Sequence, residues 1–190
     1  MKALLTERLF DALNAARTVG LRVRGSRWLT FGYVVGLSDA FVLLHQIDGR
    51  TLSLNGYTAL PLREIADVPP DDVHDFTHRA LVLKGQKPRR QPDILLLDFP
   101  GLLSSADAHF PLITLEVSHL RPDACYVGRV AKLTEKSVTL REIDTKPTWG
   151  ALSKYRYKDI TRVTFGDGYA DALWRVSKYD QQSQKTAENQ

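Results

Sequence analysis

One stretch of the sequence recurs in the same chain. GYVVGLSDAFVLLHQID at residues 32–48 aligns without a gap with GRVAKLTEKSVTLREID at residues 128–144, and seven of the seventeen positions are identical. The correspondence continues from residues 64–68 (EIADV) to residues 159–163 (DITRV), where the offset falls from 96 to 95. A long self-similarity is the mark of a duplicated unit, and this period has the size of a small domain. The chain is therefore expected to fold as two related halves.

Each copy of the repeat has the pattern of strands joined by a tight turn. Residues 138–141 (VTLR) alternate apolar and polar side chains, as a half-buried strand does. Polar and acidic residues at 37–40 and 133–136 suit a hairpin turn. Gly32 and Gly128 stand early in a strand, where glycine often marks a bend or a bulge. The pattern predicts a mainly β protein with some α, built on small, strongly curved sheets or barrels.

Other local signals set the expected boundaries. Apolar residues at helical spacing predict a helix at residues 2–16, and Asn55-Gly56 is a strong turn signal. Residues 71–85 predict a short helix with Asp71 or Asp72 as its cap and Gly85 as its end. The chain then divides into an N-terminal helix plus first barrel (1–70), a basic, partly helical linker (71–110), a second barrel (111–177) and a polar tail predicted to be disordered (178–190).

This pattern resembles the Sm/LSm family. The resemblance is carried by a leading helix, a glycine-started strand with its hairpin, and a later pair of strands around Asp-Ile-Thr-x-Val. The stretch DACYVGRV…VTLREID…YKDITRVTFGDGYADAL at residues 123–173 also resembles uncharacterised bacterial proteins thought to carry Sm-like domains. The resemblance covers roughly residues 20–68 and 112–175. It implies two tandem five-stranded, SH3-like barrels with an N-terminal helix.

The chain departs from the family at the RNA-binding motifs. Members that bind uridine-rich RNA present an Asp-x-x-x-Asn type loop after their second strand, and an Arg-Gly pair between the last two strands. Here the loops are SDAF and TEKS, without asparagine, and the later turns are PLRE and RYKD, without Arg-Gly. The family's RNA site is therefore not carried over to this chain.

Composition sets wide limits. The net charge of +4 and pI near 9.2 permit a polyanionic partner without requiring one. The single cysteine, Cys125, excludes an internal disulfide and is expected to be a small buried apolar residue. No apolar run has the length of a membrane span, and Glu7, Arg8 and Asp11 interrupt any N-terminal export signal. The expected location is the cytoplasm, with no membrane partner.

Two groups of basic residues are candidates for nucleic-acid binding. Single-stranded nucleic acid is held by a basic groove with aromatic stacking platforms, and phosphate contacts need only Lys and Arg. The alternative is a solvated strand face and a soluble linker, and this alternative is favoured. The candidate residues are Arg24, Arg27 and Trp28 in the first sheet, with Lys87, Arg89 and Arg90 in the linker.

Catalysis and metal binding have little support. Cys125 would act as a nucleophile only with a histidine beside it, and His119 is the nearest in sequence. His74 and His78 are four apart but have no identifiable third ligand, so an exposed helix face is the favoured interpretation. The sequence predicts no catalytic residue, no metal site and no cofactor.

Two functions stay open. The first is a non-enzymatic binding or scaffold module that acts through protein interaction or regulation. In it the two barrels pair inside the chain, and their remaining edge strands attract a protein partner or a second copy. The second is RNA or single-stranded nucleic-acid binding through the basic residues. A group of aromatic residues in the second half offers an interface, although most of them are expected to serve the core: Trp149, Tyr155, Tyr157, Tyr169 and Trp174.

Overall fold

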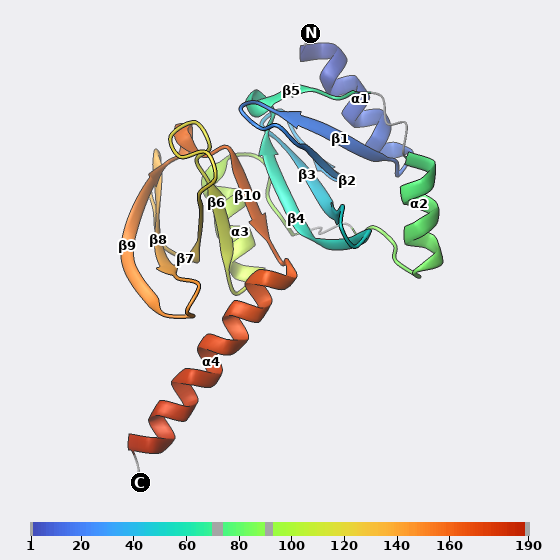
Figure 1. The fold of residues 1–190 in the computed structure, drawn as a ribbon. Coiled ribbons are helices and arrows are strands. Elements are labelled where there is room, and N and C mark those ends of the chain that lie inside the picture. Colours follow the sequence, from blue (N-terminus) through green and yellow to red (C-terminus); the bar gives the residue numbers. More distant parts are fainter. Residues whose placement is uncertain (1, 70–73, 90–92, 189–190) are drawn as a thin grey trace.

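The computed structural model of the chain describes residues 2–69, 74–89 and 93–188 (Figure 1). The first half contains α1 (Lys2–Asn14), β1 (Thr18–Val23), β2 (Leu29–Leu37), β3 (Phe41–Asp48), β4 (Ser53–Pro61), the 3₁₀ turn η1 (Leu62–Glu64) and β5 (Ile65–Asp67). Two helices follow, α2 (His74–Leu83) and α3 (Phe99–His109). The second half contains β6 (Ile113–Glu116), β7 (Cys125–Leu133), β8 (Ser137–Ile143), β9 (Trp149–Arg156), the 3₁₀ turn η2 (Tyr157–Asp159), β10 (Arg162–Phe165) and α4 (Gly168–Glu188).

The strands form one antiparallel sheet. The chain is mainly β, with 39% strand and 31% helix. Within the described residues, ten strands follow the order β5-β1-β2-β3-β4-β10-β6-β7-β8-β9, so both halves have the same internal order: fifth, first, second, third, fourth. The halves join where β4 pairs with β10, and Figure 1 shows these two strands side by side. The predicted pairing of the two halves inside the chain is therefore present.

The sheet is not closed, whereas the sequence predicts two barrels. The reason lies in β10, which pairs with β6 of its own half and with β4 of the other half. A strand has two edges, so β10 has none left to close its own half against β9. Local pattern indicates curvature, but it does not say which edges meet.

The duplicated unit is repeated in detail. The pairing of β2 with β3 shifts register between Val34 and Gly36, and that of β7 with β8 shifts between Val130 and Lys132, which are the equivalent positions. A Cβ at Gly32 would lie 2.7 Å from the His45 carbonyl oxygen, and one at Gly128 would lie 2.3 Å from that of Arg141. Both glycines are thus required because the backbones of two neighbouring strands approach closely at these positions.

Each half begins with a helix as well as five strands. The helix α1 packs on β2, and α3 packs on β7, the equivalent strand of the second half. Asp98 caps α3 by accepting a hydrogen bond from the Gly101 amide at 2.8 Å, and Pro100 lies in the first turn. The predicted linker, 71–110, therefore contributes one of the two equivalent helices.

The main core is shared by the two halves. Residues of α3, including Leu102, Leu103 and Ala106, pack with Phe41 of the first half and Phe165 of the second. A second cluster lies between α1 and the first half of the sheet, and a third lies under the first turns of α4. One face of α3 is buried in this cluster, which joins the two halves in one contiguous core.

Asn55-Gly56 does not form the predicted turn. Both residues lie inside β4, and the chain reverses at residues 49–52. Gly56 has φ +70°, and a Cβ there would lie 2.6 Å from the Asp167 amide. The Asn55 side chain accepts a hydrogen bond from the Gly168 amide at 2.8 Å. The turn-like pair instead docks the start of α4 onto the first half.

The C-terminal residues are helical where the sequence predicts a disordered tail. Residues from 178 onward, predicted to be disordered, continue α4 through Glu188, and Figure 1 shows this helix projecting away from the sheet. The predicted end of α2 at Gly85 is confirmed by its φ of +67°. The predicted caps, Asp71 and Asp72, lie outside the described residues. No helix within the described ranges is long and apolar enough to cross a membrane.

Candidate functional site

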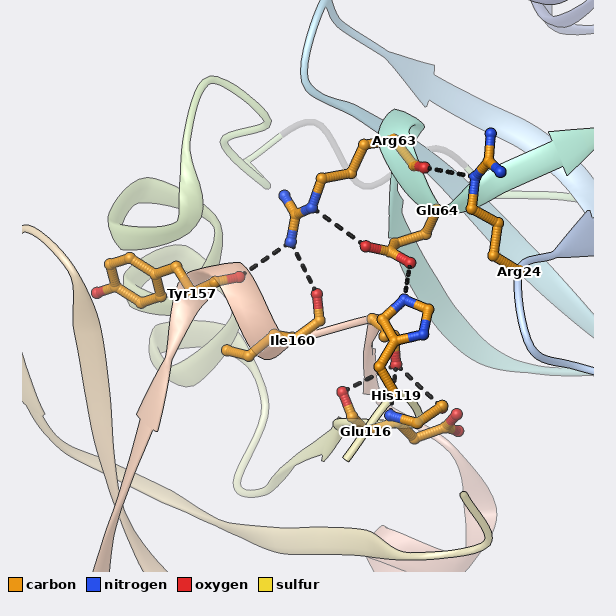
Figure 2. A network of polar contacts seen from close by, with 9 residues as sticks. Arg24, Arg63, Glu64, Glu116, His119, Tyr157 and Ile160 are labelled. Carbon is orange, nitrogen blue, oxygen red and sulfur yellow. Dashed lines mark hydrogen bonds and ion pairs between the residues drawn. The ribbon is translucent and has the colours of Figure 1, made fainter. Parts of the chain in front are cut away.

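An arginine joins the two halves at the 3₁₀ turns. Arg63, in η1, reaches across to η2, where its Nη2 donates to the carbonyl oxygens of Tyr157 and Ile160, both at 3.0 Å (Figure 2). Its Nε donates to Glu64 at 3.1 Å, and its own carbonyl accepts from Arg24 Nε at 3.1 Å. The guanidinium thus gives the Tyr157 carbonyl a second donor beside the Ile160 amide, which lies at 3.3 Å, and also donates to the Ile160 carbonyl.

Glu64 is the buried partner of this arginine. Its side chain is only 5% exposed, and its second oxygen lies 2.6 Å from His119 Nε2 of the other half (Figure 2). A buried carboxylate is stable only when charged or polar donors satisfy it. Here Arg63 comes from the first half and His119 from the second, so Glu64 fixes their relative position.

Aromatic rings pack below the arginine. Phe99, the first residue of α3, stacks on Tyr157 at 5.1 Å between ring centroids, and meets Phe41 edge to face at 4.9 Å. The Arg63 guanidinium lies 5.4 Å from the Phe99 ring centre. Burial raises the pKa of Tyr157, so its hydroxyl stays protonated and donates to the Thr134 carbonyl at 2.9 Å. The Arg63 guanidinium therefore contacts the Phe99 ring as well as the two carbonyls that it binds.

Beside this network lies a cavity of about 820 Å³, which we call the junction groove. A cavity of this size is within the range of ligand-binding clefts. Its walls come from α1, from η1 and β5, from the start of α3, and from the two hairpin turns. The lining residues are Leu4, Leu5, Arg8, Arg24, Asp39, Ala40, Phe41, Leu62, Arg63, Ile65, Ala66, Asp67, Val68, Leu97, Asp98, Phe99, Pro100, Glu135 and Tyr157.

The apolar walls of the groove are open to solvent. Leu97 is 82% exposed and Leu4 is 53% exposed, and they stand on different elements, before α3 and in α1. Two acidic residues, Asp39 and Glu135, occupy equivalent hairpin turns at its margin. Both are exposed, and within the described part of the chain neither has a recorded ion pair or side-chain hydrogen bond. The groove thus combines exposed leucines with two carboxylates that are accessible to a cation.

The predicted nucleic-acid residues fall into two groups, one after β1 and one after α2. Arg24 lines the junction groove, while Arg27 and Trp28 are exposed in the loop that follows, Trp28 by 81%. Lys87 is exposed, and Arg89 lies against His45, to which its amide donates at 3.0 Å. Arg90 lies outside the described residues. Binding of nucleic acid by these residues stays a prediction.

His45 fixes the basic segment after α2 to the first half. It is 8% exposed and stacks on Tyr57 at 4.6 Å between ring centroids, and Tyr57 donates to the Arg89 carbonyl at 3.3 Å. Burial, together with the nearby Arg89 cation, lowers the pKa of His45 from 6.5 to about 4. The imidazole is therefore neutral at neutral pH and able to accept the amide.

This histidine predicts a loss of stability in mild acid. Below pH 6.5 the unfolded chain takes up a proton at His45, while the folded chain does so only near pH 4. The contribution is complete above about pH 6.5 and lost on acidification to about pH 4, by up to about 3 kcal/mol. Urea unfolding between pH 4 and 7 measures it, with His45→Gln as the comparison. An equally steep pH dependence in both proteins would contradict the assignment.

The candidate catalytic and metal-binding residues are not brought together. Cys125 is exposed at the start of β7, so the predicted buried role is wrong. His119 contacts Glu64, and the His78 ring contacts the Tyr33 hydroxyl at 2.9 Å. Over residues 2–69, 74–89 and 93–188, no group of three or more His, Cys, Asp or Glu side chains is placed to hold a metal ion.

Two of the aromatic residues singled out in the sequence, Trp149 and Trp174, lie together beside cations that the sequence does not predict. Trp149 of β9 meets Trp174 of α4 edge to face at 6.3 Å between ring centres. Arg141 lies 5.3 Å from the Trp149 ring centre, and Lys178 and Arg129 lie 4.5 and 5.8 Å from that of Trp174. The aromatic composition of the second half is visible in the sequence. The cations beside the rings come from three separate elements, β7, β8 and α4, so their approach to the tryptophans cannot be predicted from the sequence.

Comparison with protein-family models, curated proteins and solved structures finds no match for this chain.

Proposed function

We propose that the chain is a non-enzymatic binding module that holds a short segment of a partner protein in the junction groove. The observation that carries this proposal is the groove itself, a cavity of about 820 Å³ with exposed leucines on two walls. Exposed apolar surface in a concave site is a common feature of interaction sites. The network of Arg63, Glu64 and His119 holds the two halves in place beside it, so the site is preorganised.

The chemistry of the groove selects the kind of segment. Apolar side chains of the partner would pack on Leu4 and Leu97, which are exposed now. Lysine or arginine beside them would face Asp39 and Glu135, whose carboxylates lie at the margin. Arg8 and Arg63 are already engaged, Arg8 with the Val68 carbonyl at 2.9 Å. The proposed ligand is therefore an apolar segment flanked by basic residues.

The fold is consistent with a divergent pair of Sm-like units. Support comes from the common strand order of the halves, from the helix that begins each half, and from the 3₁₀ turn between the fourth and fifth strands. In this proposal the two units have opened and merged into one sheet. We place the protein in the cytoplasm as part of the same proposal.

The cluster of Trp149 and Trp174 favours a second candidate function, binding of single-stranded nucleic acid. Such ligands stack their bases on aromatic rings and place their phosphates near cations. Arg129, Arg141 and Lys178 lie beside the two rings. Salt weakens this kind of binding steeply because phosphate contacts release counterions.

One experiment separates the two candidates. Peptides selected from a random displayed library are expected to bind the chain and to lose at least about tenfold in affinity to Ala66→Arg, which fills the groove from an exposed β5 position. Ala131→Arg, exposed on β7 outside the groove, is the matched control. Failure to select such peptides, or equal binding to the two variants, would contradict the proposal that the junction groove binds a partner segment. Salt-sensitive binding of labelled oligouridine, lost in Trp174→Ala, would establish the second candidate instead.

A further inference from the structure

The sheet has two edges, and they differ in how open they are. The edges are β5 and β9, the first and last strands of the order. An exposed edge strand is a template for pairing with another chain unless it is blunted. The junction of β4 with β10 shows how two repeats of this chain join edge to edge, with Tyr57, Thr58 and Ala59 opposite Phe165, Thr164 and Val163.

The β5 edge is blunted. Residues 68–70, equivalent to 163–165 of β10 at the offset of 95, are Val-Pro-Pro. Neither proline has an N–H to donate to a neighbouring strand. The Val68 carbonyl accepts from Arg8 at 2.9 Å, and its amide donates to the Asp67 side chain at 2.8 Å. The two prolines and the engaged Val68 thus reduce the donors and acceptors that a second copy would meet after β5, which opposes head-to-tail growth.

The β9 edge is open. Residues 152–154 of β9 are equivalent to Tyr57, Thr58 and Ala59, which in the first half pair with the next repeat. In the described part of the chain, β9 pairs with β8 only. Leu152 lies in this strand with 64% of its surface exposed. The β9 edge thus exposes an apolar residue at the position equivalent to Tyr57, where β4 of the first half pairs with another strand.

We propose that two copies of the chain join antiparallel through β9, with Leu152 on the two-fold axis, and that the assembly stops at this dimer. In such a dimer a residue of one β9 can lie opposite the same residue of the second β9. The two-fold axis is then perpendicular to the sheet, and equivalent faces of the two sheets lie on the same side. Centred on Leu152, the pair puts Lys154 opposite Gly150 and Tyr155 opposite Trp149 of the second copy. Centred on Lys154, it would oppose like charges, which is unfavourable.

Sedimentation equilibrium over a range of concentrations tests this inference. The wild-type mass is expected to rise from that of one 21.4 kDa chain to that of two and no further. Leu152→Lys, which sets two cations on the axis, is expected to remain a monomer. Leu83→Lys, at an exposed leucine of α2, and Ala66→Arg, on β5, are expected to dimerise as the wild type does.

A covalent readout fixes the register. In a Cys125→Ser background, Leu152→Cys is expected to form a disulfide-linked dimer on oxidation, whereas a cysteine at Leu83 is not. A wild-type chain that stays monomeric up to its solubility limit overturns the inference. So does a dimer that survives Leu152→Lys, and so does growth beyond two chains. The groove proposal is untouched by each of these outcomes, because its variant lies on the opposite edge.

Discussion

Gly128→Val is expected to unfold the second half of the sheet. The new Cβ would lie 2.3 Å from the Arg141 carbonyl oxygen, and backbone cannot move aside as a flexible side chain does. Gly128 is paired on both sides, with Ile113 and with Glu142, so a shift at one neighbour disturbs the other. The expected loss is more than about 3 kcal/mol, a large part of the stability of a typical domain.

The matched control for this variant is Gly150→Val. Gly150 also lies in a strand of the second half, but its nearest neighbour for a Cβ is the Glu142 carbonyl oxygen at 3.8 Å, an ordinary contact. We expect a change within about 0.5 kcal/mol. Urea unfolding followed by circular dichroism and tryptophan fluorescence measures both. Similar losses of unfolding free energy in the two variants would show that glycine is not required at position 128 by the close approach of the two backbones.

The duplication and the bend glycines could be predicted because they are local. Gly32 and Gly128 stand at the same place in two aligned stretches, and the strands around them alternate in the usual way. The structure places both where a neighbouring strand approaches closely, opposite Gln46 and Glu142. Helix α1 follows from its apolar spacing for the same reason, since a helix face is encoded in neighbouring residues.

The way the halves meet could not be predicted because it depends on distant residues. Asn55-Gly56 has the composition of a turn, yet Gly56 uses its positive φ to let the Asp167 backbone approach β4. An Asn-Gly pair indicates that the backbone adopts a positive φ, but it does not show whether a turn or a close neighbouring backbone requires that conformation. Similarly, residues 71–110 are predicted to be a partly helical linker, but this does not indicate that one face of α3 packs into the core shared by the two halves.

The junction residues also escaped prediction. Glu64 and His119 are 55 positions apart, and His119 has no feature in sequence that separates it from an isolated surface histidine. Arg63 was seen only as part of a PLRE turn that lacks a family motif. The equivalent turn of the second half has Lys158 and Asp159, so comparison of the two repeats gives no sign of a special role for Arg63-Glu64. That role arises because the Arg63 and Glu64 side chains contact the other half, whereas the Asp159 side chain pairs with Arg156 of its own half.

This asymmetry leads to the second large effect, at Glu64. Glu64→Ala is expected to cost about 3 kcal/mol, because it leaves Arg63 Nε without its carboxylate partner, empties a buried site and removes the contact with His119. Glu64→Gln keeps the shape and one acceptor oxygen, so an intermediate loss is expected. Both variants are measured by urea unfolding near neutral pH.

The repeat supplies the control for Glu64 within the same chain. Asp159 holds the equivalent position in η2, and its carboxylate, 16% exposed, pairs with Arg156, whose side chain is 58% exposed. Water screens the arginine of this pair, and the pair lies within one 3₁₀ turn, so Asp159→Ala is expected to cost no more than about 1 kcal/mol. A large difference between the two alanine variants would show that stability comes from the contact between halves. Equal losses would show that the acidic residue serves its own turn, and the junction would then be held by the shared core around α3 alone.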